Sequence, residues 1–474
     1  MRALLISTYD LGRQPFGLAS AAAWLRREGV QVSTTDIAKE KLDSAAVRSA
    51  DLVAFYLPMH TATRLAAPLI ARVRSENPSA RICAYGLYAP LNVHLLRELG
   101  VDDVLDGEFE EDLADIVRRM KALKSGRSSF GVRGSSKNTE PAPQNGERRT
   151  PNAERQMTRS LPRIHFLVPD RTGLPPLTRY ATLQLSDGTR RTVGYTEASR
   201  GCRHLCRHCP IVPIYEGQFR VVQPDVVLSD IAAQVAAGAR HITFGDPDFF
   251  NGPTHALRIV EALHAAWPEV TYDVTIKVEH LLRHASLLPR LRKNGCLFVT
   301  SAVESLDDRV LTLLEKGHTR ADFLRVIELF RAADLILVPT FVAFHPWTTL
   351  ESYCELLDTI ERVGMIGHVA PIQLAIRLLV PQGSLMLQLE DVRRVVGPFD
   401  PRSMTYPWAH SDPRVDALHR DLAALVGSRL TAARHQLFDA VSDLAHVRAG
   451  AVRAHPQPRR HRATVPYLNE PWYC

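Results

Sequence analysis

Three cysteines within eight residues constrain this chain more than any other feature of its sequence. Cys202, Cys206 and Cys209 have the spacing C-x3-C-x2-C. Thiolates are soft ligands that favour zinc or iron-sulfur clusters, and one short loop can present all three to a single metal centre. A structural zinc needs a fourth ligand, but the other cysteines lie far from this loop in the sequence. A cubane cluster held by three thiolates would instead leave one iron open to a further ligand.

At these residues the chain resembles the radical SAM superfamily, in which a loop of this spacing follows the first strand of a partial barrel. In that family S-adenosylmethionine (SAM) binds the open iron of a 4Fe-4S cluster. The resemblance implies that the three cysteines are the cluster ligands. It also places His208, which stands where the family usually has an aromatic residue, beside the adenine of SAM. The alternatives are a zinc loop and a simple ferredoxin-like centre.

Length and composition fit a globular protein of several domains in a reducing compartment. The 474 residues correspond to about three domains of ordinary size. No apolar run approaches the ~18 to 20 residues of a membrane span, and the opening segment turns polar too soon for a secretory signal. Cysteines gathered in one loop do not form a disulfide framework, which favours a cytoplasmic location.

The net charge of +7 is concentrated in two segments of low apolar content. Residues 121–160 hold nine Lys or Arg and three Glu, and residues 448–463 hold five Arg and no acid, so the rest of the chain carries −4. Basic charge in loose segments is typical of solvated chain rather than of a binding face. We therefore expect no nucleic-acid partner, although an acidic partner stays open.

The first 120 residues alternate between short apolar strands and helices. The pattern predicts a doubly wound parallel sheet, whose ligand crevice lies at the carboxyl ends of the strands. The predicted strands are 2–7, 30–36, 51–57, 81–85 and 104–107, and the predicted helices are 18–28, 61–76 and 110–120.

In order and architecture this region resembles the cobalamin-binding domain of cobalamin-dependent radical SAM enzymes. The D-x-H-x-x-G signature that supplies a histidine to cobalt is absent, because the first strand is followed by residues 9–13, Tyr-Asp-Leu-Gly-Arg. The resemblance therefore implies no lower histidine ligand from that position. It places the walls of the pocket at residues 59–61 and 86–89. The alternative is a flavodoxin-like domain that serves only a structural purpose.

The rest of the chain is predicted to form a partial barrel and a C-terminal helical segment. An Asp-Gly turn at 187–188 predicts a hairpin that leads into the cysteine loop. Six strand and helix units then fit the incomplete (β/α)6 barrel of the superfamily, with chemistry at the carboxyl ends of the strands. The predicted strands are 193–198, 241–245, 271–276, 297–302, 335–344 and 369–376. The predicted domains are 1–122 (cobalamin-binding-like), 123–160 (disordered linker), 161–395 (radical SAM domain) and 396–474 (C-terminal helical extension and tail).

Several polar residues follow the predicted barrel strands. Gly245, Asp246 and Asp248 stand where the family has its G-G-E motif, which implies acceptors for the SAM ammonium, although an ordinary Asp-Pro turn is the alternative. Ser301 and Glu304 resemble the ribose-binding segment of the family. A buried arginine must be paired, so Arg377 on the sixth predicted strand is expected at the methionine carboxylate of SAM. Lys277 and Glu279 share one face, either as an ion pair or as part of the site wall.

The predicted function is a radical SAM enzyme that reductively cleaves SAM at a 4Fe-4S cluster and modifies a small-molecule or peptide substrate by radical chemistry. The cobalamin-like domain favours cobalamin-dependent methyl transfer, with flavodoxin or ferredoxin as electron donor. One alternative is a radical SAM enzyme without cobalamin. Another is a metal-stabilised electron-transfer or binding protein. The sequence identifies neither the substrate nor a catalytic residue.

The last ten residues, 465–474, are apolar for a chain terminus and include Trp472 and Cys474. We expect this tail to pack back on the protein. It resembles the tail of radical SAM proteins that end in Cys-Cys-Ala-Glu-Pro or Cys-selenocysteine-Ala-Glu-Pro. The resemblance raises the hypothesis that translation continues through a selenocysteine codon after Cys474, against the alternative that Cys474 is the natural end.

Overall fold

The computed structural model describes residues 1–124, 163–429, 432–453 and 465–469 of the chain. The N-terminal domain is a five-stranded parallel sheet in the order β2-β1-β3-β4-β5. The sequence-predicted order of strands and helices is confirmed here. The strands are β1 (Arg2–Ser7), β2 (Gln31–Asp36), β3 (Leu52–Tyr56), β4 (Arg81–Tyr85) and β5 (Asp103–Val104).

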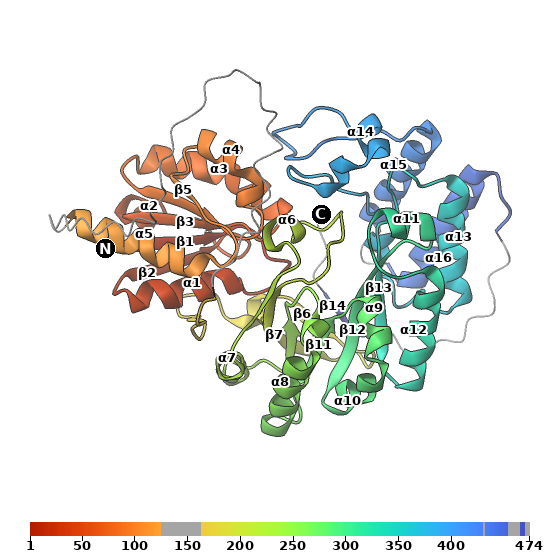
Figure 1. The fold of residues 1–474 in the computed structure, drawn as a ribbon, viewed down its shortest axis with the longest axis horizontal. Coiled ribbons are helices and arrows are strands. Elements are labelled where there is room, and N and C mark those ends of the chain that lie inside the picture. The colour runs from red at the N-terminus through yellow and green to blue at the C-terminus, as the bar shows by residue number, and fades with distance from the viewer. Residues whose placement is uncertain (125–162, 430–431, 454–464, 470–474) are drawn as a thin grey trace, which may run out of the picture.

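Helices cover both faces of this sheet, on the left of Figure 1. One hydrophobic cluster packs α1 and α5 against one face, and a second packs α2, α3 and α4 against the other. The sheet is doubly wound because its strands are apolar on both sides, as in β3, where every residue is buried. The helices are α1 (Phe16–Arg27), α2 (Ser44–Ser49), α3 (His60–Glu76), α4 (Val93–Glu98) and α5 (Phe109–Lys124).

The second sheet contains five parallel strands in the order β13-β12-β11-β10-β7, and they form the curled wall of a half-barrel. Strand β6 (Thr182–Gln184) pairs antiparallel with β7, which confirms the predicted hairpin. The parallel strands are β7 (Arg190–Thr196), β10 (His241–Phe244), β11 (Thr271–Thr275), β12 (Cys296–Glu304) and β13 (Ile336–Phe341).

Helices on the outside of the half-barrel share one hydrophobic core with two C-terminal helices, α15 (Pro413–Ser428) and α16 (Arg434–Ala449). Figure 1 shows α13 and α16 beside each other on the right. These outer helices are α7 (Pro224–Ala236), α8 (Pro253–Ala266), α9 (Val278–Arg283), α10 (Leu288–Lys293), α12 (Arg320–Ala332) and α13 (Leu350–Arg362). Helix α11 (Asp308–Leu313) packs instead in a smaller cluster with residues between 378 and 392.

The predicted sixth strand, 369–376, is wrong. This segment contains a 3-10 helix at Pro371–Leu374, and only an isolated bridge between Phe344 and Arg377 continues the sheet. Pro371 has no backbone N–H to give to a ladder. The side chain of Gln373 accepts a hydrogen bond from the backbone N–H of Phe341 at 3.0 Å. A side-chain amide therefore takes the place of a backbone partner at this edge of β13.

Part of the C-terminal tail adds a strand to the sheet. Strand β14 (Tyr467–Leu468) pairs antiparallel with β6, and Asn469 donates its backbone N–H to Thr182. The expectation that the tail packs back is confirmed for these residues. Trp472 and Cys474 lie outside the described residues, as do residues 125–160 of the linker predicted at 123–160, whose first two residues belong to α5.

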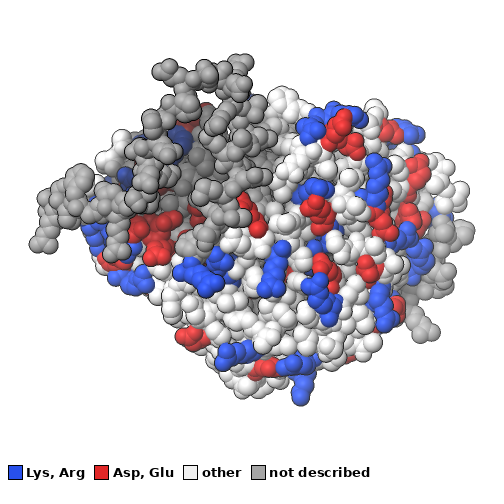
Figure 2. All heavy atoms as spheres, in the orientation of Figure 1, with Lys and Arg blue, Asp and Glu red and all other residues white. Residues whose placement is uncertain are grey.

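On the face shown in Figure 2, acidic and basic side chains of the described residues alternate, and no single basic patch covers that visible part. None of the helices within the described ranges combines the length and the apolar character that a membrane span requires.

Candidate active site at the cysteine loop

The cysteine loop begins directly after a short strand at the mouth of the half-barrel. Strands β8 (Ser199–Gly201) and β9 (Phe219–Val221) pair antiparallel and enclose the loop, together with the single turn α6 (Val212–Tyr215). Gly201 has φ of +75°, and a Cβ on it would lie 2.5 Å from the backbone oxygen of Gln218. Only glycine permits this tight entry, which fixes the start of the loop.

The three cysteines are arranged for a cluster rather than for a single zinc ion. Cys206 is buried, and Cys202 and Cys209 are half-buried. Their sulfur atoms do not all lie within 4.8 Å of one another in the described structure. Sulfur atoms bound to one tetrahedral zinc would be about 3.8 Å apart. Burial raises the pKa of Cys202, and it raises the pKa of Cys209 to about 12, so these thiols need metal binding to lose their protons.

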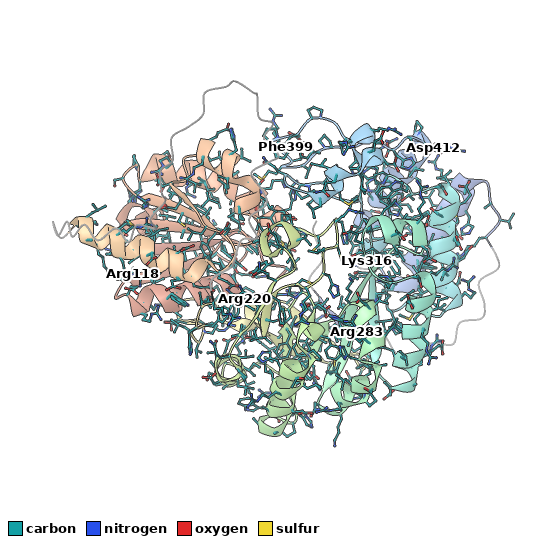
Figure 3. All side chains as sticks on the ribbon, viewed as in Figure 1. Arg118, Arg220, Arg283, Lys316, Phe399 and Asp412 are labelled. Carbon is teal, nitrogen blue, oxygen red and sulfur yellow. The ribbon has the colours of Figure 1, made fainter. Side chains whose placement is uncertain are left out.

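A buried lysine and glutamate lie beside the loop. The Nζ of Lys316 is 3.3 Å from Oε1 of Glu304, and the two side chains are 4% and 9% exposed. Burial acts to lower the pKa of Lys316, but Glu304 and the thiolates of Cys206 and Cys209 raise it overall. Lys316, labelled in Figure 3, therefore supplies the positive charge that thiolate ligands require. The sequence pattern alone did not identify Lys316, which directly precedes Gly317.

Glu304 also contacts His208, so two predicted site residues meet. Nε2 of His208 lies 3.1 Å from Oε1 of Glu304. Burial acts to raise the pKa of Glu304, but Lys316 and His208 lower it to about 2. Glu304 has φ of +70°, where the register between β12 and β13 shifts. This left-handed backbone is unusual for glutamate and turns its carboxylate toward the cysteine loop.

The loop after β10 holds the neighbouring segments together through both of its carboxylates. A Cβ on Gly245 would lie 1.8 Å from the hydroxyl of Tyr195, so glycine is required there. Asp246 accepts hydrogen bonds from the backbone of Ala198 at 2.8 Å and from the hydroxyl of Ser199 at 2.5 Å. Burial raises the pKa of Asp246 to about 7.

Asp248 is almost fully buried on the same loop. It accepts a hydrogen bond from the backbone N–H of Phe250 at 3.0 Å, and its other oxygen faces His204 and His280. Because both carboxylates of this loop are engaged by protein groups, the backbone carbonyls are the acceptors left for an ammonium. The roles of Gly245, Asp246 and Asp248 toward SAM stay predictions.

Buried polar atoms without partners lie on β12 and in the cysteine loop. Ser301 on β12 is completely buried, and its hydroxyl has no hydrogen-bond partner among the described residues. Nδ1 of His208 likewise has no hydrogen-bond partner among the described residues. Buried polar groups are nearly always satisfied in a protein, so such atoms fit a polar ligand like the sugar and base of SAM.

Arg377 is engaged by the C-terminal segment. It donates to Asp416 at 2.7 Å and to the backbone oxygen of Trp408 at 2.7 Å, and its guanidinium lies 3.5 Å from the centre of the Trp408 ring. The expectation that this arginine is paired is confirmed, but its partner is a protein carboxylate. Contact between Arg377 and the methionine carboxylate of SAM stays a prediction.

A buried charge cluster joins the cysteine loop to the N-terminal domain. Arg200 on β8 lies 3.0 Å from Glu108 and 2.6 Å from Glu110, both of the N-terminal domain, and 2.7 Å from Glu197 after β7. Burial raises the pKa of Glu108 to about 7 and also raises that of Glu197. Sequence analysis did not identify this cluster, because its partners are about ninety residues apart.

This cluster brings the carboxyl edge of the N-terminal sheet to the cysteine loop. At that edge, Ser7 Oγ, Asp10 Oδ2 and Asn92 Oδ1 are buried without hydrogen-bond partners among the described residues. Nε2 of His60, at the start of α3, lies 2.6 Å from the backbone oxygen of Ser403 in the C-terminal segment. The edge therefore offers unused polar atoms to a ligand between the two domains.

Residues 196–361 match the model of the radical SAM superfamily. The chain contains a radical SAM domain. Such a domain implies a 4Fe-4S cluster and SAM, and the three cysteines with Lys316 fit the cluster.

Curated relatives match over a little more than a third of this chain. A tRNA-2-methylthio-N(6)-dimethylallyladenosine synthase of Nitratidesulfovibrio vulgaris is 26% identical over 188 residues, which are 36% of this chain and 40% of that protein. A ribosomal protein uS12 methylthiotransferase of Desulfotalea psychrophila is also 26% identical, over 37% of this chain and 41% of its own. The chain thus spans about two fifths of the length of these relatives.

Two solved structures share the fold of both domains. The cobalamin-dependent SAM radical enzyme OxsB, with aqua-cobalamin and SAM bound, matches with a TM-score of 0.67 and 13% identity, over 94% of this chain and 71% of its own. The radical SAM methyltransferase TsrM of Kitasatospora setae matches with a TM-score of 0.57 and 18% identity, over 77% and 73%. The predicted α/β architecture, with an N-terminal parallel sheet followed by a partial barrel, is confirmed.

Proposed function

We propose that this chain is a cobalamin-dependent radical SAM enzyme that transfers a methyl group to a small-molecule or peptide substrate. The observation that carries the proposal is the Arg200 cluster, since it brings the carboxyl edge of the N-terminal sheet against the cysteine loop. Two cofactors that take part in one reaction must bind close to each other. Similarity to the folds of OxsB and TsrM supports the same arrangement.

Cobalamin would bind at the edge where Ser7, Asp10 and Asn92 have unpaired polar atoms, walled by residues 59–61 and 86–89. When bound, cobalamin would carry the methyl group, and the iron-sulfur cluster would supply the electron that cleaves SAM. Cys202, Cys206 and Cys209 would hold the cluster, and Lys316 would balance the charge of their thiolates. Ser301, Glu304 and His208 would bind the adenosine part of SAM, and the Gly245 loop its ammonium.

Methylthio transfer, the reaction named for the sequence relatives, is the second candidate. It requires a source of sulfur as well as a methyl group. The described cysteines outside the loop are Cys83 on β4, Cys296 on β12 and Cys354 on α13, each buried in a different element. Because these three cysteines lie in separate elements, they offer no second loop like that of Cys202, Cys206 and Cys209 in the described structure, and methyl transfer is favoured.

Anaerobic reconstitution tests the proposal. Protein supplied with iron, sulfide and hydroxocobalamin should retain about one cobalamin per chain after gel filtration, seen in its visible spectrum. Reduction in the presence of SAM should release both 5′-deoxyadenosine and S-adenosylhomocysteine. Release of 5′-deoxyadenosine without cobalamin retention would leave a radical SAM enzyme whose N-terminal domain is structural. Zinc bound at the three cysteines in place of an iron-sulfur cluster, without SAM cleavage, would overturn both.

A further inference from the structure

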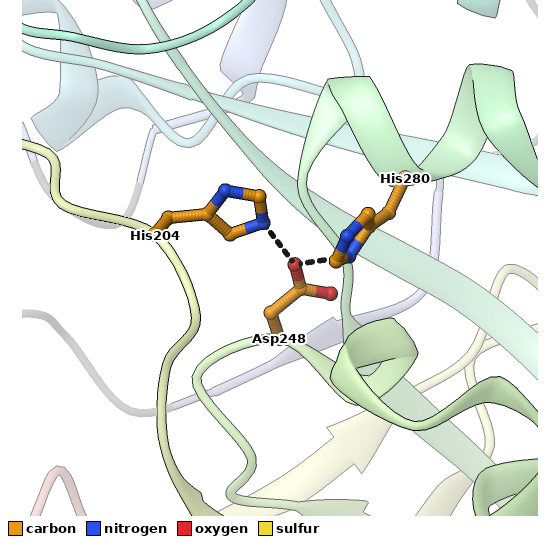
Figure 4. Close-up of side chains that lie close together, drawn as sticks. All are labelled: His204, Asp248 and His280. Atoms are coloured by element: carbon orange, nitrogen blue, oxygen red, sulfur yellow. Dashed lines mark ion pairs between the residues drawn. The ribbon is translucent and has the colours of Figure 1, made fainter. Parts of the chain in front are cut away.

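A second group of metal-binding side chains lies next to the cysteine loop. His204, Asp248 and His280 come from three different segments: the loop itself, the turn after β10 and the helix α9. One possible ligand atom from each lies within 4.8 Å of the others. Figure 4 shows the two imidazoles turned toward one carboxylate oxygen of Asp248.

Ordinary hydrogen bonding does not account for this arrangement. Oδ2 of Asp248 lies 3.3 Å from Nε2 of His204 and 2.7 Å from Nδ1 of His280. By distance both contacts are ion pairs, but neither has hydrogen-bond geometry, so the three atoms lack hydrogen-bond partners among the described residues. The side chains of Asp248 and His280 are 2% and 5% exposed, and that of His204 is 14% exposed. Three such atoms that converge on one point are better satisfied by a shared ligand than by one another.

We propose that His204, Asp248 and His280 bind one divalent transition-metal ion, separate from the iron-sulfur cluster. Two imidazole nitrogens and one carboxylate oxygen form a donor set that suits zinc or iron(II). If an ion lay about 2.1 Å from each atom, the N–metal–O angle would be about 80° for His280 and about 104° for His204. Both angles lie within the range of four- to six-coordinate sites.

The second ring nitrogen of His204 determines whether the metal can bind. Its Nδ1 lies 2.9 Å from Nζ of Lys277 and 3.6 Å from Oε2 of Glu279. A metal on Nε2 requires a proton on Nδ1, and this proton would face Oε2 of Glu279, which lies 3.6 Å away and pairs with Lys277 at 3.5 Å. Without metal, Lys277 donates to Nδ1 instead. Glu279 therefore favours the metal-bound tautomer, and Lys277 opposes it.

The metal would tether the cysteine loop to the barrel. His204 lies between two cluster cysteines, whereas Asp248 and His280 follow β10 and β11. Three protein ligands also leave coordination positions open to water or to an oxygen or nitrogen atom of a bound molecule. The metal site stands without the proposed methyl transfer, since metal binding is measured in the absence of SAM cleavage.

Metal analysis of the cluster-loaded full chain is the first test. After loading with zinc alone and removal of loose metal, we expect four irons and one zinc per chain by mass spectrometry. X-ray absorption at the zinc edge should show nitrogen and oxygen neighbours with imidazole scattering. Absence of zinc would overturn the proposal, and so would zinc–sulfur distances of about 2.3 Å, which would place the ion at the cysteines.

Variants test which residues hold the ion. Asp248→Asn and His280→Ala should each weaken zinc binding at least 100-fold in a chelator competition. His284→Ala is the matched control, because its ring lies 5.9 Å from that of His280 but outside the group. Circular dichroism and cluster absorbance verify that each variant is folded. Equal affinity in the His280 and His284 variants would contradict the assignment.

The neighbours of His204 give a second test that does not remove a ligand. Glu279→Gln should weaken zinc binding by 10- to 100-fold, as is usual for the partner of a metal-bound histidine. Lys277→Met should leave the affinity unchanged or increase it, because it removes the competing donor. Weakening by Lys277→Met and none by Glu279→Gln would overturn the proposed tautomer and with it the metal site.

Discussion

The carboxyl edges of the two parallel sheets occupy equivalent positions in their domains, and both bury carboxylates, but the groups around those carboxylates differ. At the barrel edge, Asp248 and Glu304 face lysine and histidine side chains; at the N-terminal edge, the carboxylates lie among aromatic rings and share Arg200 as a cation. The barrel cations are Lys277, Lys316 and His280, which are buried, and His204 and His208, which are half-buried; the N-terminal group is Asp10, Glu108, Glu110, Tyr56, Tyr85 and Phe109.

In both domains the topology determines where a ligand binds, whereas the side chains at the sheet edge determine which charge the ligand can carry. A cluster held by three thiolates is anionic and requires nearby cations, which the barrel edge provides. The N-terminal edge suits such a ligand less well, because Arg200, which faces it, is already paired with Glu108, Glu110 and Glu197. Four predictions test this difference between the two edges.

The largest effect is expected at the barrel edge. Replacing Cys202, Cys206 or Cys209 by Ala should abolish SAM cleavage, because each thiolate is a cluster ligand. Folding should be retained, since the loop is not part of the hydrophobic core. Iron content and 5′-deoxyadenosine release measure the effect. Cys354→Ala, a buried cysteine on α13, is the control and should keep the cluster. Cleavage at the original rate in any loop variant would refute the cluster assignment.

The second-largest effect is expected from the charge cluster around Arg200, which joins the two edges. Arg200→Met should lower the free energy of unfolding by about 3 to 5 kcal/mol, because it leaves buried carboxylates without their counter-charge. Urea denaturation measures this. Arg292→Met is the control, since its pair with Asp334 is 48% and 92% exposed and should contribute less than about 1 kcal/mol. A loss as small as the control's would show that Arg200 is not the link between the domains.

A smaller, pH-dependent effect is expected from Asp10 at the N-terminal edge. Burial raises its pKa from 3.8 to about 7 in the folded protein, so between these values the folded chain keeps a proton that the unfolded chain releases. Stability due to this group is therefore full below pH ~4 and falls as the pH rises to ~7, by up to about 1.4 kcal/mol per pH unit. Asp10→Asn should remove this dependence, so that its stability relative to the natural protein increases from pH 4.5 to 7.5. A difference that is constant with pH would contradict the raised pKa.

The sequence predicted most of what depends on local pattern. The cysteine spacing, the N-terminal strands and five barrel strands are evident because each is encoded in contiguous residues. The failure at 369–376 arose because Pro371 and Gln373 replace backbone pairing with a side-chain contact. Arg200 and Lys316 were missed for a different reason. Their importance depends on residues that only the packing of the domains and the curvature of the barrel bring close.

The smallest effect is expected from Ser301→Ala, which tests whether the Ser301 hydroxyl at the barrel edge binds a ligand or only packs. Ser301 is completely buried with an unpaired hydroxyl, whereas the hydroxyl of Ser305 accepts a hydrogen bond from the backbone of Asp307 at 3.1 Å. If the ribose of SAM bonds to Ser301, Ser301→Ala should weaken SAM binding by about 0.5 to 1.5 kcal/mol, roughly 2- to 13-fold.

The same change should not destabilise the protein without SAM, because it removes a buried polar group that has no protein partner. Ser305→Ala should do the opposite, with a small loss of stability and unchanged SAM affinity. Equilibrium dialysis with SAM and urea denaturation of both variants measure the two quantities. A Ser301→Ala protein that binds SAM as tightly as the original, or that loses as much stability as Ser305→Ala, would show that this hydroxyl serves packing rather than the cofactor.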